Sequence, residues 1–278
     1  MKKLLSMLCV LAFIPSTVFA SPSMMEVLAG VVSQQGGTDF TQDANCMGAW
    51  YMNSTSTSEL DRSGNSADLA YINTPATTNT VPTTPVYSGN SLDFERTTQE
   101  DSLFIADGGS TDISGSEQSM TVSAWVKPES TSEDYFIVTK YDYGNDQRQF
   151  DLQTSGSTSY KFAVSSDGTF ATGADSVSTS TAPSIGTWVH VVGVYNAETD
   201  LLDIYINGVK DATSVSHVNG IHDGTSTFNI GAIRNSTAPA GWYDGLIDEA
   251  IIFDRVLSVT EILSIYNNGI DGSNGGND

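Results

Sequence analysis

The amino-acid sequence predicts an all-β protein: a two-sheet antiparallel sandwich, or jelly roll, with one short C-terminal helix. From Cys46 onward the chain is divided into short apolar segments, several of which alternate with period two, as in Met120–Val126. Turn signals such as Asp167-Gly168 and Asn207-Gly208 separate these segments. Many short strands at close spacing, with almost no helix, are typical of antiparallel sandwiches.

The strands follow from these apolar segments. They are predicted over Cys46–Met52, Ser91–Phe94, Leu103–Ile105, Met120–Val126, Tyr135–Tyr141, Gln149–Thr154, Lys161–Ser165, Trp188–Asn196, Leu201–Ile206, Phe228–Ile230 and Ile247–Phe253.

Other segments have different patterns. Asn53–Gly89 is rich in Ser, Thr, Asn and Pro, which predicts a long surface loop. Ser258 and Glu261 have the spacing of a capping box, so a short helix is predicted to begin there. Trp125 and Trp188 are expected in the core, with His190 packed or hydrogen-bonded on the face of Trp188.

The first twenty residues have the pattern of a secretory signal peptide. Lys2 and Lys3 precede the apolar segment Leu4–Ile14, and a small-residue cleavage site ends at Ala20. The apolar segment is too short to span a bilayer, so no membrane insertion is expected. The mature protein is expected to be secreted, either extracellular or periplasmic.

The mature chain is predicted to have three parts. Residues 21–45 form an N-terminal arm, helical or flexible, in which the apolar segment Met24–Val32 is a candidate surface for self-association. Residues 46–270 form the sandwich domain. Residues 271–278, rich in Gly, Asn and Asp, form a flexible tail.

Composition restricts the partners. The chain has 33 acidic and 11 basic residues, for a formal net charge of −22. Such a surface repels nucleic acid and anionic membranes and favours divalent cations. Removal of Cys9 with the signal peptide leaves Cys46 alone, which excludes an internal disulfide.

No catalytic residues are assigned from the sequence. Glycoside hydrolases need a pair of carboxylates, and no predicted strand has acidic residues at alternating positions. The sequence also lacks a Gly-x-Ser-x-Gly motif and a phosphate-binding loop.

Several motifs, in order along Cys46 to Asn268, are shared with a known family. The chain resembles the laminin-G-like, concanavalin A-like jelly-roll domains of secreted bacterial proteins. The motifs are Ala49-Trp50-Tyr51 with Asp61–Asn65, Ser91–Phe94, Met120–Pro128, Gly186–Tyr195, Leu202–Val209 and Gly245–Ser258.

The resemblance implies glycan binding more often than catalysis, and a structural calcium ion near the last strand. Asp248 is the position most like a calcium ligand, with backbone carbonyls near Gly89 completing the shell. Asp61 and Asn65 lie in a glycine-containing turn that offers further oxygens. Glu249 is expected on the opposite face from Asp248, because neighbouring side chains alternate along a strand.

Two loops are candidate ligand sites. Trp242 and Tyr243 lie between two glycines, and aromatic faces stack on sugar rings. The loop from Tyr141 to Arg148, including Tyr143, is a second polar and aromatic segment. Its Arg148, together with Arg234, is suited to bind a sugar carboxylate or sulfate, although pairing with neighbouring acids is the simpler expectation.

The sequence therefore favours a secreted non-catalytic module that binds glycans or glycosylated surfaces, stabilised by calcium. A structural subunit of a surface layer, filament or matrix is the alternative. A glycoside hydrolase or polysaccharide lyase is the third hypothesis.

Overall fold

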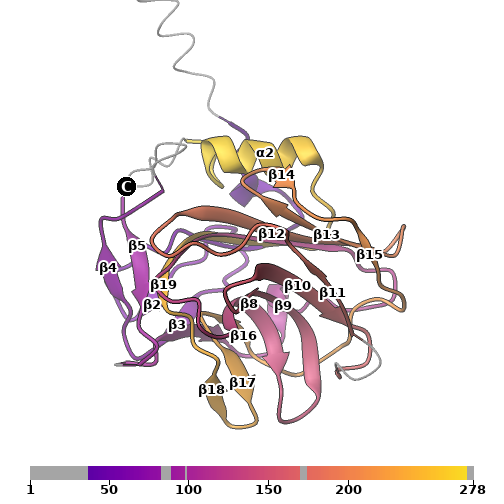
Figure 1. Ribbon diagram of the computed structural model, residues 1–278, viewed down its shortest axis with the longest axis horizontal. Helices are drawn as coiled ribbons and strands as arrows, with labels where there is room; N and C mark the ends of the chain where they lie inside the picture. Colours follow the sequence, from indigo (N-terminus) through magenta and orange to yellow (C-terminus); the bar gives the residue numbers. More distant parts are fainter. Residues whose placement is uncertain (1–36, 83–88, 98, 170–173, 274–278) are drawn as a thin grey trace, which may run out of the picture. The chain divides into compact units, whose positions relative to one another are not determined.

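The computed structural model describes residues 37–82, 89–97, 99–169 and 174–273, and it contains the predicted two-sheet sandwich (Figure 1). The predicted signal peptide, the segment Met24–Val32 and the end of the tail lie outside the described residues. No helix among the described residues is long and apolar enough to cross a membrane.

One sheet has nine strands. Its last strand in sequence, β19 (Gly245–Phe253), pairs with β7 (Met120–Pro128) along one edge. Along the other edge it pairs first with β5 (Ser91–Phe94) and then with β1 (Cys46–Trp50). The remaining strands of this sheet are β4 (Ala76–Thr78), β12 (Val189–Asn196), β13 (Leu201–Ile206), β14 (Val209–Lys210) and β15 (Val215–Ser216).

The other sheet has ten strands, and β8 (Tyr135–Asp142) connects its main path to a side hairpin. That hairpin consists of β17 (Ile233–Asn235) and β18 (Ala238–Ala240), and it joins β8 through a parallel pairing of Arg234 with Asp142. The other strands are β2 (Ser58–Glu59), β3 (Leu69–Ile72), β6 (Ser102–Ile105), β9 (Gln147–Ser155), β10 (Ser159–Ser165), β11 (Ala174–Ser178) and β16 (Phe228–Ile230).

The predicted loop Asn53–Gly89 is wrong in part, because it contains the short strands β2, β3 and β4. Strands β2 and β4 have two and three residues, too few to show an alternating pattern. They are the end strands of their respective sheets, so their sequences need no continuous apolar face.

The main core lies between the two sheets. Its largest side chains are aromatic, and the rings of Trp50 and Phe228 lie 5.2 Å apart. The sheets approach closely at Gly193 of β12, because a β-carbon there would overlap the ring of Phe162. A larger residue at this position would push the sheets apart.

A second apolar layer covers the nine-stranded sheet from outside (Figure 1). It is formed by the 3-10 helix η1 (Phe40–Gln42) and by α2 (Val259–Asn268). The predicted capping box is confirmed: Ser258 Oγ accepts from the amide of Glu261, and Glu261 Oε2 accepts from the amide of Ser258. The helix therefore begins where the sequence predicts.

Two tryptophans expected in the core have other positions. Trp125 is buried, but its ring stacks on Tyr266 of α2, with centroids 5.5 Å apart, rather than between the sheets. Trp188 is only half-buried and precedes β12. His190 is buried as expected, with Nε2 2.7 Å from Ser123 Oγ, and burial lowers its pKa to about 3.

Candidate functional site

A β-bulge in β19 sets the position of two adjacent acids. Asp248 lies opposite Trp125 of β7, and the next paired residue is Ile251, so one extra residue is inserted. Glu249 has a φ of 44°, in the left-handed region. The strict alternation that predicted opposite faces for the two acids therefore does not hold across the bulge.

Both acids of the bulge are buried. Asp248 is 4% exposed and Glu249 1%. Asp248 Oδ1 accepts from the amide of Glu249 at 2.9 Å, and Glu249 Oε2 accepts from the amide of Ile270 at 3.2 Å. Burial, and then the charge of Glu249, raise the pKa of Asp248 well above its usual range. A buried carboxylate of this kind needs a proton or a cation to neutralise it.

The residues of the bulge fit a calcium ion. Strand β5 pairs with residues 245–247 of β19, and β1 pairs with residues 250–253, so Asp248 and Glu249 lie between the two pairings. No lysine, arginine or histidine among the described residues pairs with Asp248. Calcium prefers oxygen ligands, and this position offers two carboxylates.

Asp61 is held differently. Its two carboxylate oxygens accept from the amides of Ala49, Ser63, Asn65 and Ala67 at 2.9–3.1 Å, and from Ser63 Oγ. These donors occupy the oxygens that a cation would need, so Asp61 orders its own turn.

The two remaining predicted metal positions, Asn65 and Gly89, are not joined to the acids of the bulge. Asn65 donates from Nδ2 to the carbonyl of Cys46 at 2.7 Å, which ties its turn to β1. Gly89 is exposed, with a φ of 100°, two residues before β5. Among the described residues, no hydrogen bond joins Asp61, Asn65 or Gly89 to Asp248.

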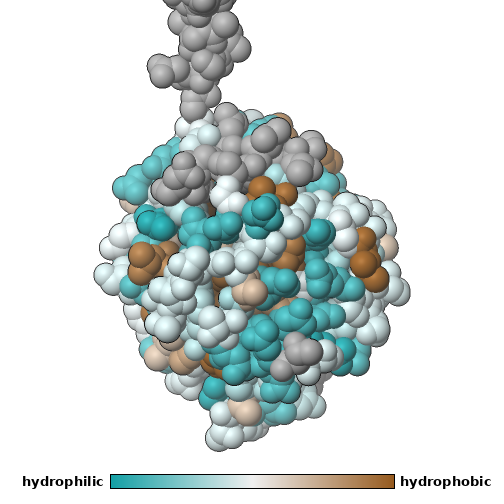
Figure 2. All heavy atoms as spheres, turned by 90° about the vertical axis from the view of Figure 1, so that its left-hand side faces the viewer, coloured by the Kyte–Doolittle hydropathy of each residue, from teal (hydrophilic) through white to brown (hydrophobic). Residues whose placement is uncertain are grey.

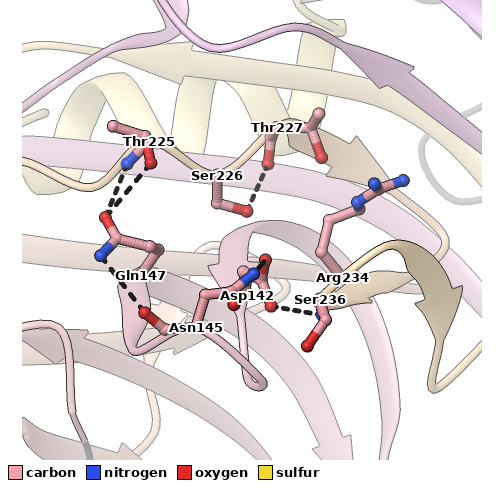
Figure 3. Close-up of a pocket in the computed structure, with 8 residues that line it drawn as sticks. All are labelled: Asp142, Asn145, Gln147, Thr225, Ser226, Thr227, Arg234 and Ser236. Carbon is pink, nitrogen blue, oxygen red and sulfur yellow. Dashed lines mark hydrogen bonds between the residues drawn. The ribbon is translucent and has the colours of Figure 1, made fainter.

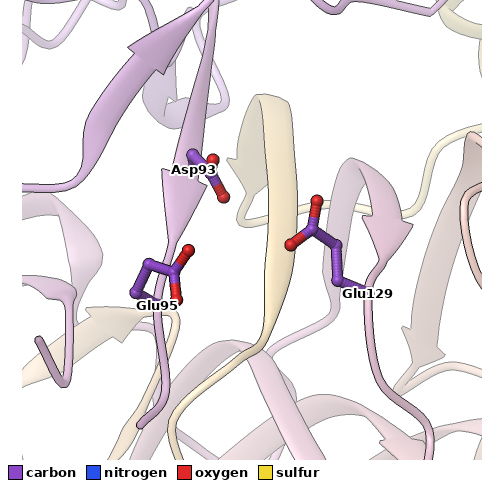
Figure 4. Close-up of side chains that lie close together, drawn as sticks. All are labelled: Asp93, Glu95 and Glu129. Atoms are coloured by element: carbon purple, nitrogen blue, oxygen red, sulfur yellow. The ribbon is translucent and has the colours of Figure 1, made fainter. Parts of the chain in front are cut away.

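Another acidic group lies near the start of β19. Asp93, Glu95 and Glu129 have carboxylate oxygens that all lie within 4.8 Å of one another (Figure 4). Burial and the neighbouring acids raise the pKa values of Asp93 and Glu129, while the charge of Lys127 lowers them. The cluster is partly open to solvent, which distinguishes it from the bulge.

The predicted aromatic loop is largely closed. Tyr243 is completely buried, and its amide donates to the carbonyl of Gly231. Burial raises its pKa well above the usual range. Trp242 is half-buried, and its indole nitrogen is shielded from solvent. The prediction that Tyr243 presents a face to a sugar is wrong, because the loop packs into the sandwich.

The second predicted loop, between β8 and β9, presents one aromatic side chain. Tyr143 is 59% exposed and is the only exposed aromatic residue in the described part of the chain. Tyr141 is buried, which raises its pKa to about 12. Arg148 is also buried: it pairs with Asp146 and its guanidinium lies 4.9 Å from the Tyr143 ring centroid. Arg148 therefore supports Tyr143 from inside the protein.

A polar pocket of about 370 Å³ lies next to this loop (Figure 3). Three segments line it: the β8–β9 loop, the segment before β16, and the β17–β18 hairpin. The lining residues are Asp142, Asn145, Gln147, Thr225, Ser226, Thr227, Arg234 and Ser236.

Two side chains hold the three segments together. Asp142 Oδ1 accepts from the amides of Gly144 and Ser236 at 3.0 and 2.7 Å, which joins the two hairpins. Gln147 Oε1 accepts from the amide of Thr225 at 3.0 Å. The amide of Tyr143 donates to the carbonyl of Arg234 at 2.9 Å, so the backbone of Tyr143 is held against the hairpin that lines the pocket.

Figure 2 shows a face on which hydrophilic and intermediate residues dominate and hydrophobic residues lie scattered. Scattered exposed apolar residues are normal for a soluble domain.

A family model described as the concanavalin A-like lectin/glucanases superfamily matches residues 97–263, more than half of the chain. The chain belongs to this superfamily. The predicted resemblance is therefore confirmed, and the two face-packed sheets are the fold that this superfamily domain was expected to have.

Solved structures share the fold at low identity. The binding domain of Paraclostridial Mosquitocidal Protein 1 is 17% identical, with a TM-score of 0.63 over 82% of this chain and 52% of that one. A botulinum neurotoxin type C structure is 14% identical, with a TM-score of 0.61 over 81% and 51%. This chain spans about half the length of those two solved chains.

A third solved structure matches over almost its full length. It is domain 4 of AbnA, an extracellular arabinanase from Geobacillus stearothermophilus, in complex with arabinotriose. It is 18% identical, with a TM-score of 0.56 over 80% of this chain and 98% of that one. No curated protein sequence matches the chain.

Proposed function

We propose that this chain is a secreted, non-catalytic carbohydrate-binding module whose ligand contacts Tyr143 and the adjacent polar pocket. The observation that carries the proposal is the position of Tyr143, an exposed aromatic residue that follows Asp142 and whose backbone bonds to Arg234, two residues of a hydroxyl- and amide-lined cavity. A sugar presents an apolar ring face to an aromatic side chain and hydroxyl groups to polar ones. Export rests on the signal-peptide pattern of the sequence.

Solved structures with the same fold support carbohydrate as the ligand class. The arabinanase domain was solved with arabinotriose, and cell entry of the type C neurotoxin depends on interaction with two ganglioside molecules. At identities of 14–18% these proteins support the class of ligand and not the particular sugar.

The pocket favours binding over hydrolysis. Asp142 is the only carboxylate among its lining residues, whereas glycoside hydrolysis uses two. Asp142 also accepts three hydrogen bonds, from the amides of Gly144 and Ser236 and from Asn145 Nδ2, and is thereby committed to holding the hairpins.

The same proposal includes a structural calcium ion held by Asp248 and Glu249. Bound calcium would neutralise two buried carboxylates and join the last strand to the segments beside it. A ligand that binds only the native state raises stability by about 4 kcal/mol at a thousandfold excess over its dissociation constant. Chelation is expected to lower the melting temperature of the unmutated protein but to change that of Asp248→Asn little. Glu129→Gln is the matched control, because it removes an acid from the other cluster.

A glycan array followed by titration tests the ligand site. Tyr143→Ala is expected to weaken binding of an array hit about tenfold or more, while Trp242→Ala leaves it unchanged. Both variants must first show wild-type melting or be compared at a temperature where each is folded. Loss of binding in Trp242→Ala alone would return the site to the Gly241–Gly245 loop. Failure of every glycan to bind would reject the carbohydrate-binding proposal.

A further inference from the structure

The pocket contains an arginine without a carboxylate partner. Arg234 is half-buried, and no carboxylate among the described residues lies within 4.0 Å of its guanidinium. Its hydrogen bond is from Nη2 to the carbonyl of Thr237 at 3.2 Å, within its own hairpin. In a chain with three times as many acidic as basic residues, an arginine left unpaired in a cavity is available to a ligand.

Asp142, the carboxylate that lines the pocket, does not pair with the guanidinium of Arg234. Asp142 shares the cavity with Arg234, but its oxygens accept from Gly144, Ser236 and Asn145. Figure 3 shows the bonds that Asp142 accepts from Ser236 and Asn145, and shows none from Arg234 to another lining residue. The second acid of the loop, Asp146, is paired with Arg148 at 2.7 Å. The local acids are thus engaged, while the guanidinium keeps free donors.

The other lining groups are neutral hydroxyls and amides, from Thr225, Ser226, Thr227, Asn145 and Gln147. A guanidinium forms its strongest hydrogen bonds, often in pairs, with carboxylate, sulfate or phosphate oxygens. The volume of about 370 Å³ is at the small end of ligand pockets, which suits one or two sugar rings.

We infer that the pocket selects acidic glycans, in which a carboxylate or sulfate group on the sugar binds Arg234. This inference rests on the proposed function, because it specifies the ligand of the same site. It also addresses the charge of the chain: a net charge of −22 repels polyanions at long range, so the selective contact must be local.

Matched polysaccharides test the inference. Polygalacturonate is compared with its fully methyl-esterified form, which keeps the backbone and removes the carboxylate charge. Carrageenan is compared with its chemically desulfated form, which keeps the backbone and removes the sulfate. Binding is measured by titration calorimetry at 150 mM salt with the full mature chain. The acidic member of at least one pair is expected to bind about tenfold tighter or more than its neutral partner, as for a charge-assisted hydrogen bond. The pair that shows the preference identifies the acidic group.

Variants separate geometry from charge. Arg234→Gln is expected to reduce the preference to about one, because only the side chain is changed and the backbone bonds of β17 remain. Arg234→Lys is expected to keep part of it, since lysine retains the charge without the planar fork. Arg62→Gln is the control, because this substitution changes the net charge by the same amount. Arg62 is exposed, stacks on Tyr51 and does not line the pocket.

The outcomes separate this inference from the proposed function. Equal binding of acidic and neutral members, unaffected by Arg234→Gln but weakened by Tyr143→Ala, would overturn the acidic preference and leave carbohydrate binding intact. An equal loss in Arg62→Gln and Arg234→Gln would assign the preference to net charge and overturn the role of Arg234. Absence of binding to all four polysaccharides and to the array would overturn both.

Discussion

Two polar regions of this protein differ in how their carboxylates are satisfied. At the β19 bulge, Asp248 and Glu249 are buried beside each other, and no lysine, arginine or histidine in the described part of the chain pairs with Asp248. At the pocket, Asp142 accepts three hydrogen bonds, and Arg234 and Tyr143 remain accessible. A buried acid without a cationic partner is a candidate position for a stabilising ion, whereas an acid that already accepts hydrogen bonds beside accessible side chains is consistent with a ligand surface.

The largest expected loss of stability comes from the contact between β7 and helix α2. Trp125 is 1% exposed and stacks on Tyr266, so Trp125→Ala is expected to lower the free energy of unfolding by about 3–5 kcal/mol. Trp188 is half-buried, so Trp188→Ala is expected to cost clearly less. Urea denaturation of both variants checks the ranking. Equal losses would mean that the two tryptophans are equally important to packing.

Asp151 provides a buried acid away from both regions. It is completely buried on β9, neither carboxylate oxygen has a hydrogen-bond partner among the described residues, and burial raises its pKa to about 7. Because the pKa is higher in the folded state than in the unfolded state, protonation of Asp151 stabilises the fold. This stabilisation is complete below pH 4 and is lost as pH rises through 7. Asp151→Asn is expected to be more stable than wild type by roughly 2–4 kcal/mol at pH 8, and equally stable at pH 4.

Thermal melts across this pH range decide the point. A constant difference between Asp151→Asn and wild type would show that the carboxylate does not change its ionisation on folding. Equal melting temperatures for Asp151→Asn and wild type at every pH would show that the Asp151 carboxylate has hydrogen-bond partners in solution.

Calcium at the bulge should have its own pH signature. Because the pKa of Asp248 is raised, protonation stabilises the calcium-free protein as pH falls through that raised pKa. Calcium competes with that proton, so the difference in melting temperature between calcium and chelator is expected to shrink over the same range. Asp248→Asn should remove most of this dependence. A difference that is constant with pH would place the ion elsewhere.

The smallest expected effect on stability, but a large one on binding, comes from the pocket. A β-carbon at Gly144 would overlap Ser236 Oγ, so Gly144→Ala should displace the β17–β18 turn. Binding of the array hit is expected to fall about tenfold or more, with a cost in stability of about 1 kcal/mol. Gly156→Ala is the matched control, because Gly156 has open space around it although its φ is 51°. Equal binding by both variants would contradict the pocket assignment.

The sequence predicts the sandwich well because its central strands have the required pattern. Strands β5, β13 and β16 have the predicted bounds, and Ser258 caps α2 as expected. Short end strands such as β2 and β4 are missed because two or three residues show no periodicity. Their pairing depends on distant segments of the chain.

The sequence predicts the candidate sites less completely. Asp248 is singled out through a family resemblance, and the expectation that Glu249 faces away from it rests on an alternation that the bulge interrupts. The loop containing Tyr143 and Arg148 is identified from its composition. Which of its residues are exposed depends on the β17–β18 hairpin, whose Ala-Pro-Ala strand has no β signature. Exposure of Tyr143 and burial of Tyr243 are therefore tertiary properties.

The most direct test of the central claim is to map the ligand on the unmutated protein. Amide chemical-shift changes are recorded by NMR while the tightest array hit is added to the calcium-loaded mature chain. The largest changes are expected at Tyr143, Gln147, Thr225 and Arg234, around the pocket. Changes confined to Trp242 and its neighbours, with none at Arg234, would contradict it.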